Sequence, residues 1–344
     1  MVIREQIGEG MFKTVFKGTV HLPAAVAPAP VTAAILRFKQ QVPKEEVDWA
    51  LLERVGKHLY LVSTIAYATV AAGSSVQIAT QLCPAGDLHT RLQDLADEEA
   101  QVSPLVALRI ALQAAMGLQQ LASVDVIHRD VAARNILLQS FDPRDQNKVH
   151  VKVGDYGLSK AGGAYYYDSR HAKPLPVRWM SPEANRRHRF SEKSDVWAYA
   201  VMLWEVFSLG DKPYFLFPDD SVVIGKIVAG VTLEQPARCP AAVFAELLQP
   251  CWAARAQDRP SFTDLVATAM RLYDTTLLEG AQGAQGVGRA QGLRCVVCLD
   301  AAADTAFSPC GHKCVCQEHS SAFASGTPCP LCRAPIQSAL KIYE

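Results

Sequence analysis

The sequence predicts an α+β fold followed by a small, separate domain at the C-terminal end. Apolar and polar residues alternate as in strands within the first 40 positions, most clearly over residues 31–38. From about Val102 the apolar residues recur at helical spacing, and residues 196–209 form an almost wholly apolar helix. Seven of the ten cysteines lie between Cys295 and Cys332, which sets the last part of the chain apart.

Length and composition limit the classes of protein that fit. The chain has 344 residues, 49% hydrophobic and 20% charged, so it suits one large globular domain plus a small one. Its formal net charge of zero argues against a nucleic-acid or anionic-membrane partner. We find no apolar run near the roughly 20 residues of a membrane helix, and no signal-peptide pattern in residues 1–30. We therefore expect a cytoplasmic protein with no membrane segment.

Three parts follow from the changes in composition. Residues 276–293 are rich in Gly, Gln and Ala, and the triplet Ala-Gln-Gly occurs three times between positions 281 and 292. No hydrophobic period survives there, so we predict a flexible linker. The boundaries are then 1–275 for the large domain, 276–293 for the linker and 294–344 for the small domain.

A run of polar residues at positions 128–135 carries the strongest functional signal. It reads His-Arg-Asp-Val-Ala-Ala-Arg-Asn, and Asp-Tyr-Gly follows at 155–157. Phosphoryl transfer needs a carboxylate to hold the attacking hydroxyl and oxygen ligands to hold Mg²⁺. These motifs and their spacing resemble the protein kinases. The resemblance implies a small β-rich lobe, a larger helical lobe, ATP between them, Asp130 as the base, and Asn135 and Asp155 as magnesium ligands.

The first strands resemble the glycine-rich loop that covers the nucleotide in kinases. Its glycines let backbone amides approach phosphate. Where the third glycine normally stands, this chain has Lys13, which shares a strand face with Val15. The resemblance implies nucleotide contacts at Ile7, Gly8, Gly10 and Val15.

The third strand departs from the kinase pattern. Kinases place a lysine there, two residues after a small residue that packs on adenine. The natural match puts Ala34 on adenine and Leu36 at the lysine position, and a shifted register would offer Arg37 instead. The with-no-lysine kinases move this lysine to the loop position held here by Lys13. We favour such a relocated lysine; the alternative is a solvated charge on a degenerate loop.

The lysine of kinases usually pairs with an acid on the first helix. Asp48 is the candidate, because Leu52 then falls one turn later where an apolar residue should pack inward. Matching Trp49 instead would put Glu53 in that apolar place, and Asp48 can also be an exposed acid early in the helix. The resemblance further implies that the nucleotide pocket contains Thr80, Gln81, Cys83 and Leu137.

Two matches indicate tyrosine as the substrate. The arginine at position 134, four residues after the expected base, matches the tyrosine-kinase pattern. Residues 175–183 also resemble that family; they read Leu-Pro-Val-Arg-Trp-Met-Ser-Pro-Glu and are called the platform below. This platform is deep enough for a phenol ring in that family. We also expect Arg259 to pair with Glu183 for structural reasons, and the resemblance spans about residues 3–273.

Three adjacent tyrosines lie between the expected metal ligand and the platform. Tyr166 and Tyr167 stand at the spacing where tyrosine kinases are autophosphorylated. A phosphate there would gain charge-assisted bonds to Arg129. The alternative is an unmodified aromatic cluster that packs on the helical lobe.

The cysteine-rich end has the spacing of a metal domain. Eight Cys and His residues form four pairs, enough for two tetrahedral Zn²⁺ sites. About 50 residues bury little core, so metal would supply the folding free energy. The order resembles a RING finger. One zinc would then take Cys295, Cys298, Cys316 and His319, and the other Cys310, His312, Cys329 and Cys332. Cys314 is surplus and could replace Cys316.

A RING ligase positions a ubiquitin-conjugating enzyme and its ubiquitin rather than reacting itself. The resemblance places the contacts with that enzyme and with ubiquitin at Val297, Pro330, Leu331 and Arg333. Residues 336–343 resemble tails through which some RING domains form homodimers. The alternative is a domain that only binds a partner.

We therefore predict a protein tyrosine kinase joined to a RING ubiquitin ligase. Its cofactors would be ATP, Mg²⁺ and two Zn²⁺, and its partners would be proteins with tyrosine, a ubiquitin-conjugating enzyme and ubiquitin. The competing hypothesis is a pseudokinase that recruits targets to an active ligase. Leu36 and the short side chain of Asp48 favour it, and the intact Asp130, Asn135 and Asp155 oppose it.

Overall fold

The structure is a computed structural model that describes most of the chain. The residues described are 1–9, 13–27, 29–39, 49–70, 75–156, 175–283, 295, 297, 301, 303–308, 313–321, 323, 325–327, 329 and 335–341. The chain divides into two compact units. The larger comprises Met1–Arg144 and Lys148–Tyr273, and the smaller comprises Asp145–Asn147 and Asp274–Glu344. Gly10, Asp48, Tyr166 and Tyr167 lie outside the described residues.

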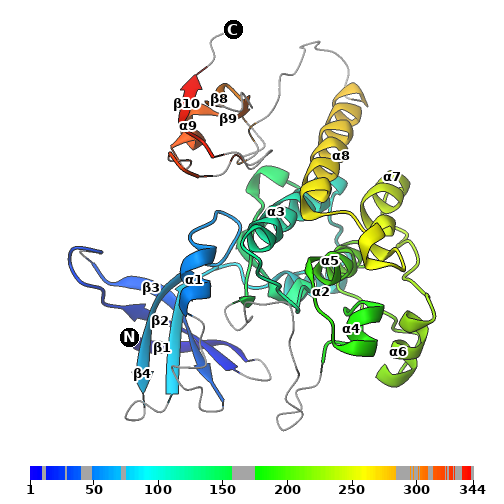
Figure 1. Ribbon diagram of the computed structural model, residues 1–344, viewed down its shortest axis with the longest axis horizontal. Coiled ribbons are helices and arrows are strands. Elements are labelled where there is room, and N and C mark those ends of the chain that lie inside the picture. The colour runs from blue at the N-terminus through cyan, green and yellow to red at the C-terminus, as the bar shows by residue number, and fades with distance from the viewer. Residues whose placement is uncertain are drawn as a thin grey trace. The chain divides into compact units, whose positions relative to one another are not determined.

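An antiparallel sheet forms the first lobe of the larger unit (Figure 1). Its strand order is β1-β2-β3-β5-β4, and Val20, Ala33, Ile35 and Ala79 form its buried centre. The alternation predicted over residues 31–38 is confirmed as β3. The elements are β1 (Val2–Glu9), β2 (Lys13–Val20), β3 (Val31–Phe38), α1 (Trp49–Val55), β4 (Thr64–Val70) and β5 (Ser75–Gln81).

The second lobe is helical and is built around α3 and α5. Ser103 caps α3 by accepting a hydrogen bond from the Val106 amide at 3.3 Å, and Ser191 and Ser194 form a capping box on α5. The Tyr199 hydroxyl of α5 donates to the Ala111 carbonyl of α3 at 2.9 Å. The helices are α2 (Leu88–Asp97), α3 (Pro104–Ser123), α4 (Pro182–Arg187), α5 (Glu192–Phe207), α6 (Asp220–Val228), α7 (Ala241–Val243) and α8 (Phe262–Gly283).

Helix α3 corrects one expectation from the sequence. It has 20 residues, and an 18-residue window within it has a mean hydropathy of 1.3, so it passes a test for a membrane span by length and composition alone. The expectation that no run approaches this length was therefore wrong. In the structure 83% of that segment is buried inside the unit. Even its polar Arg109 and Gln113 are buried and donate to the Val149 carbonyl at 3.2 and 3.0 Å, as in a core helix.

A short hairpin carries the loops that the sequence singled out. Strand β6 (Ile136–Ser140) follows the 3-10 turn Ala133–Asn135 and pairs with β7 (His150–Val153). The Val153 amide donates to the Tyr60 carbonyl at 2.8 Å, and the Val62 amide donates to the Val153 carbonyl at 2.9 Å. The segment ahead of β4 is thereby joined to the hairpin, so both lobes meet at these loops.

The expected linker differs from the structure in its first part. Helix α8 continues to Gly283, so residues 276–283 are helical and not the irregular coil that we predicted. Loss of the hydrophobic period does not end a helix whose side chains, such as Leu, Glu, Ala and Gln, still favour it. Residues 284–293 lie outside the described part, and the domain boundaries stay a prediction.

The smaller unit has its own sheet and a small core. Strand β8 (Thr305–Ser308) pairs with β9 (Lys313–Val315) and with β10 (Ser338–Lys341), and α9 covers Gln317–Ser320. Phe307 is buried, and its ring lies 5.2 Å from that of Phe323. A domain of this length buries little apolar surface and needs additional stabilisation.

Candidate active site and zinc site

The loop over residues 128–135 is fixed by a buried acid of α5. The Asp195 carboxylate accepts hydrogen bonds from the amides of His128 at 2.6 Å and Arg129 at 2.9 Å. Burial raises the pKa of Asp195 to about 6, although these bonds and the neighbouring charges lower it. Arg129 has a φ of +71°, a conformation that costs a residue with a side chain about 1–3 kcal/mol. Such strain is found where a loop must present functional groups.

Asp130 is held by two side chains from the same loop. The Asn135 side-chain amide donates to the Asp130 carbonyl at 2.6 Å and to its Oδ2 at 2.9 Å. Arg134 forms an ion pair with Oδ1. The Asp130 side chain remains 40% exposed, so a substrate hydroxyl can approach it. Because Nδ2 of Asn135 donates to Asp130, the atom that Asn135 can offer to a cation is its own side-chain oxygen, Oδ1.

Asp155 follows β7 and is joined to the same loop. His128 Nε2 hydrogen-bonds the Gly154 carbonyl at 2.7 Å, and the Asp155 backbone has a φ of +67°. Tyr156 is buried and donates its hydroxyl to the Val62 carbonyl, and burial raises its pKa. Asp155 and Asn135 offer hard oxygen ligands on linked loops, so the donor set fits Mg²⁺.

Lys13 lies beside Asp155. Its ammonium forms an ion pair with Oδ1 of Asp155, and its side chain is only 18% exposed. The sheet register explains this direction, because Lys13 pairs with Phe38 and Val15 pairs with Leu36, so all four share one face. Lys13 therefore brings a positive charge from β2 to Asp155, the acid expected to bind Mg²⁺.

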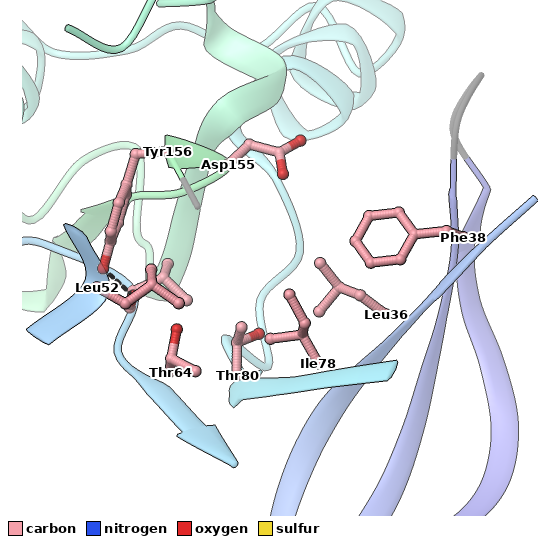
Figure 2. A pocket seen from close by; sticks show the side chains of 9 residues that line it. Leu36, Phe38, Leu52, Thr64, Ile78, Thr80, Asp155 and Tyr156 are labelled. Carbon is pink, nitrogen blue, oxygen red and sulfur yellow. Dashed lines mark hydrogen bonds between the residues drawn. The ribbon is translucent and has the colours of Figure 1, made fainter. Parts of the chain in front are cut away.

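The third strand, β3, places a leucine near Asp155, where kinases usually have a lysine. Figure 2 shows Leu36 between Phe38 and Ile78, in a pocket that Asp155 also lines. Arg37 is exposed on the other face, with its guanidinium 5.1 Å from the centre of the Phe16 ring. The strand therefore has Leu36, and not Arg37, on the face of the pocket, as in the unshifted match to the kinase pattern. The lining residues are Leu36, Phe38, Leu52, Val62, Thr64, Ile78, Thr80, Asp155 and Tyr156.

The first helix supplies an apolar residue to this pocket. Leu52 packs against Phe38, Val76 and Ile78, as the sequence predicted. Glu53 is exposed. Within the described part of α1, no acid approaches Lys13.

The other predicted nucleotide contacts lie around β1, β3, β5 and β6. Ala34 is buried and pairs with Thr80, whereas Ile7 is 44% exposed and Gly8 pairs with Val15. The Gln81 backbone N–H donates to the Ser63 carbonyl at 2.8 Å, so this donor is already occupied. Cys83 and Leu137 are half-buried, and burial raises the pKa of the Cys83 thiol to about 11.

The platform (residues 175–183) contacts the loop over residues 128–135, here called the catalytic loop, through the aromatic ring of Trp179. The Arg134 guanidinium lies 4.6 Å from the centre of the Trp179 ring, a cation–π distance. Arg259 binds Glu183 through both oxygens, at 2.7 and 2.9 Å, so that pairing is confirmed. Burial alone would raise the pKa of Glu183, but Arg259 holds it below its usual value.

One residue of the site was not singled out from the sequence. Glu205 of α5 is 1% exposed and accepts hydrogen bonds from the Ala133 amide and from Trp179 Nε1, both at 2.9 Å. The available signal was an acid in an otherwise apolar helix, since Glu is almost never fully buried unless paired.

In the smaller unit, three of the predicted zinc ligands meet. The ligand atoms of Cys295, Cys316 and His319 lie within 4.8 Å of one another, and the Cys316 sulfur is 3.1 Å from His319 Nδ1. Thiolate and imidazole groups at such distances fit a tetrahedral zinc site, and zinc there would hold the domain's loops together. Cys316 belongs to this group, whereas Cys314 is buried on β9.

The remaining predicted residues of this unit are only partly described. Val297 is 7% exposed, which leaves little of its side chain for an enzyme to contact. Cys329 is buried. Outside the described residues lie Cys298, Cys310, His312, Pro330, Leu331, Cys332 and Arg333.

Comparisons with known proteins find a family match for each part of the chain. Residues 1–269 match the family model "Protein tyrosine and serine/threonine kinase", and residues 291–339 match the RING-type zinc finger, C3HC4 type. Mouse tyrosine-protein kinase ZAP-70 is 34% identical over 81% of this chain and 43% of its own length. Mouse tyrosine-protein kinase Fer is 33% identical over 76% of this chain and 30% of its own length. Chicken inactive tyrosine-protein kinase 7 is 39% identical over 53% of this chain and 17% of its own length.

The chain thus spans less than half the length of these curated relatives. The two-lobed unit, the loop that holds Asp130 and the match over residues 1–269 support one assignment. The chain belongs to the protein tyrosine and serine/threonine kinase family and carries a RING-type zinc finger at residues 291–339.

Proposed function

We propose that the chain transfers the γ-phosphoryl group of ATP to tyrosine hydroxyls of proteins. The observation that carries this proposal is the ion pair between Lys13 and Asp155. A kinase that has leucine on its third strand needs another cation at the phosphates, and Lys13 brings one to the metal-binding acid. Phosphoryl transfer depends on positioning and charge more than on covalent chemistry, so the strand that carries the lysine matters less than where its charge lies.

Each residue then has a defined role. Asp130 accepts the proton of the tyrosyl hydroxyl, and Arg134 and Asn135 orient its carboxylate. Asp155 and Asn135 hold Mg²⁺, which neutralises charge on the phosphates when bound. Lys13 binds phosphate oxygens from β2. Arg134 and Trp179 border the place of the phenol ring, which supports tyrosine as the acceptor.

A pseudokinase is the second candidate, and one observation favours it. Leu36 lines an apolar pocket beside Asp155, and one relative carries the word inactive in its name. In that case the kinase domain would recruit target proteins to the RING finger. The paired Asp130 and Asn135 favour the active enzyme, because a recruiting domain has no use for an oriented base.

The test is tyrosine autophosphorylation of the intact, zinc-loaded chain with Mg·ATP. We expect phosphotyrosine in the wild type and none in Asp130→Asn, which keeps the size of the side chain and removes the base. Product on serine or threonine alone would contradict the acceptor class. No product from a wild-type chain that is folded by circular dichroism would favour the pseudokinase.

We further propose that the RING finger promotes ubiquitin transfer from a conjugating enzyme. The meeting of Cys295, Cys316 and His319 supports a zinc-held scaffold of this kind. A conjugating enzyme charged with ubiquitin should discharge faster with the wild-type chain than with Arg333→Ala. An equal rate in both would leave the domain as a binding module. Strand β10 lies at a sheet edge with its four residues exposed, which supports a homodimer through the tail.

A further inference from the structure

Glu205 is an acid whose contacts reach both the catalytic loop and the platform. Its carboxylate is buried within α5, a helix that is otherwise apolar over its last turns. The same oxygen, Oε2, accepts from the Ala133 amide and from the Trp179 indole, both at 2.9 Å. These donors come from segments 46 residues apart in sequence. A single oxygen atom therefore ties the two segments together.

The contacts continue from Glu205 to the expected base. The Trp179 ring is anchored by Glu205 and lies 4.6 Å from the Arg134 guanidinium. Arg134 in turn pairs with Oδ1 of Asp130. The position of the Trp179 ring thus limits where the guanidinium can lie, and the guanidinium limits the orientation of the carboxylate. The contacts of Glu205 are with Ala133, Trp179 and His89, so its effect on Asp130 passes through these neighbours.

The surroundings of Glu205 contain few other charges. His89 of α2 places Nδ1 3.7 Å from Oε1, and the catalytic loop contributes Arg134 and Asp130. Burial lowers the pKa of His89, so this ring is mainly neutral near pH 7. Burial likewise raises the pKa of Glu205 to about 7, which the two hydrogen bonds and Arg134 oppose and Asp130 reinforces. Glu205 therefore changes charge near neutral pH.

We propose that Glu205 is a positioning residue for tyrosine phosphorylation, and that its ionised form holds the platform and the catalytic loop in register. Hydrogen bonds to an ionised acceptor are roughly twice as strong as neutral ones. Protonation of Glu205 weakens the anchor of Trp179 and so loosens Arg134 and Asp130. This inference deepens the proposed kinase function and rests on it for its kinetic part. Its structural part stands on the Trp179 contact alone.

The first experiment reads the indole directly. The chain has five tryptophans, so ¹⁵N-indole spectra of the full chain are simple, and Trp179→Phe identifies the Trp179 signal. We expect that signal to shift with pH with a midpoint near 7 in the wild type. The shift should vanish in Glu205→Gln, which keeps the acceptor oxygen but cannot ionise. Glu192→Gln is the matched control, since Glu192 lies in the same helix and accepts from the Phe262 amide instead. It should leave the titration unchanged.

The second experiment measures phosphorylation of a tyrosine peptide between pH 6 and pH 8. An acid with a pKa of about 7 is roughly one-tenth as ionised at pH 6 as at pH 8, so wild-type kcat should fall by up to about tenfold. Glu205→Gln should show lower kcat at pH 8 and a flat profile. We expect KM for the peptide to rise and KM for ATP to stay within about twofold, because Glu205 contacts the tyrosine platform.

These results separate the inference from the kinase proposal. A Trp179 signal that does not titrate, or that still titrates in Glu205→Gln, would overturn the inference. The wild-type titration needs no Glu205 variant, so a folding defect in Glu205→Gln cannot hide that outcome. An unchanged kcat profile in Glu205→Gln would also overturn it. A normal titration with no phosphotyrosine in any variant would support the positioning contact and contradict the kinase function.

Discussion

Arg259 is a buried cation whose loss should destabilise the larger unit measurably. Its side chain is fully buried and makes four hydrogen bonds, two to Glu183 and one each to the carbonyls of Ala253 and Lys193. Arg259→Leu fills similar space but leaves Glu183 without its cation and both carbonyls without a donor. Breaking such a pair costs about 3–5 kcal/mol. Because Glu183 is 24% exposed and water can reach it, we expect about 3 kcal/mol.

This loss is large enough to measure by urea unfolding of the full chain, followed by circular dichroism. In thermal unfolding, about 3 kcal/mol corresponds to a Tm lower by roughly 6–12 °C for a unit of this size. Arg255→Leu is the matched control. Arg255 lies four residues before Arg259 in the chain, and its ion pair with Asp258 is exposed. We expect no measurable change in that variant. Equal unfolding midpoints for the two leucine variants would refute the reasoning.

Three further predictions follow from the contacts described. In a Lys13→Ala chain, Leu36→Lys should restore at least tenfold of the lost Mg·ATP affinity, because position 36 faces Asp155; calorimetry showing no recovery would contradict the register. The pKa of Glu183 is lower in the folded state than its ordinary value of 4.5, so the ionised Glu183 stabilises the fold fully at pH values above 4.5. This stabilisation is lost as the pH falls through the folded pKa. The stability of Glu183→Gln, measured by urea unfolding, should therefore fall less than that of the wild type between pH 5 and pH 3. Removing zinc with a chelator should abolish the unfolding transition of the smaller unit, since zinc supplies roughly 10–16 kcal/mol of folding free energy; a transition that persists without zinc in scanning calorimetry would show a self-sufficient core.

The parts predicted well from the sequence are those governed by local periodicity. Strand alternation put Lys13 on the same face as Val15, and the register of β2 with β3 shows both on the face that carries Leu36, the residue that the kinase match put at the lysine position. The helical spacing from Val102 identified the core helix α3. The pairing of Arg259 with Glu183 followed from motif resemblance and is present in the structure.

The parts that were not predicted depend on contacts between distant residues. Glu205 binds Ala133, 72 residues away in sequence, and no local pattern reports that distance. The hydropathy of α3 reflects burial on all sides, which composition alone cannot separate from a lipid environment. The continuation of α8 to Gly283 depends on helix propensity after the apolar period has ended. Zinc stoichiometry, cytoplasmic location and the phosphorylation of Tyr166 and Tyr167 stay predictions.

Mg·ATP affinity, measured by calorimetry on the intact chain and paired with tyrosine autophosphorylation, tests the central claim most directly. The comparison is between wild type, Lys13→Ala and Arg37→Ala. Each variant removes one cation, Lys13 from β2 or Arg37 from the neighbouring β3, and of these two residues Lys13 is the one that faces Asp155. We predict that Lys13→Ala loses at least tenfold in Mg·ATP affinity and loses autophosphorylation, whereas Arg37→Ala retains both. Wild-type affinity and autophosphorylation in Lys13→Ala would contradict the relocated lysine.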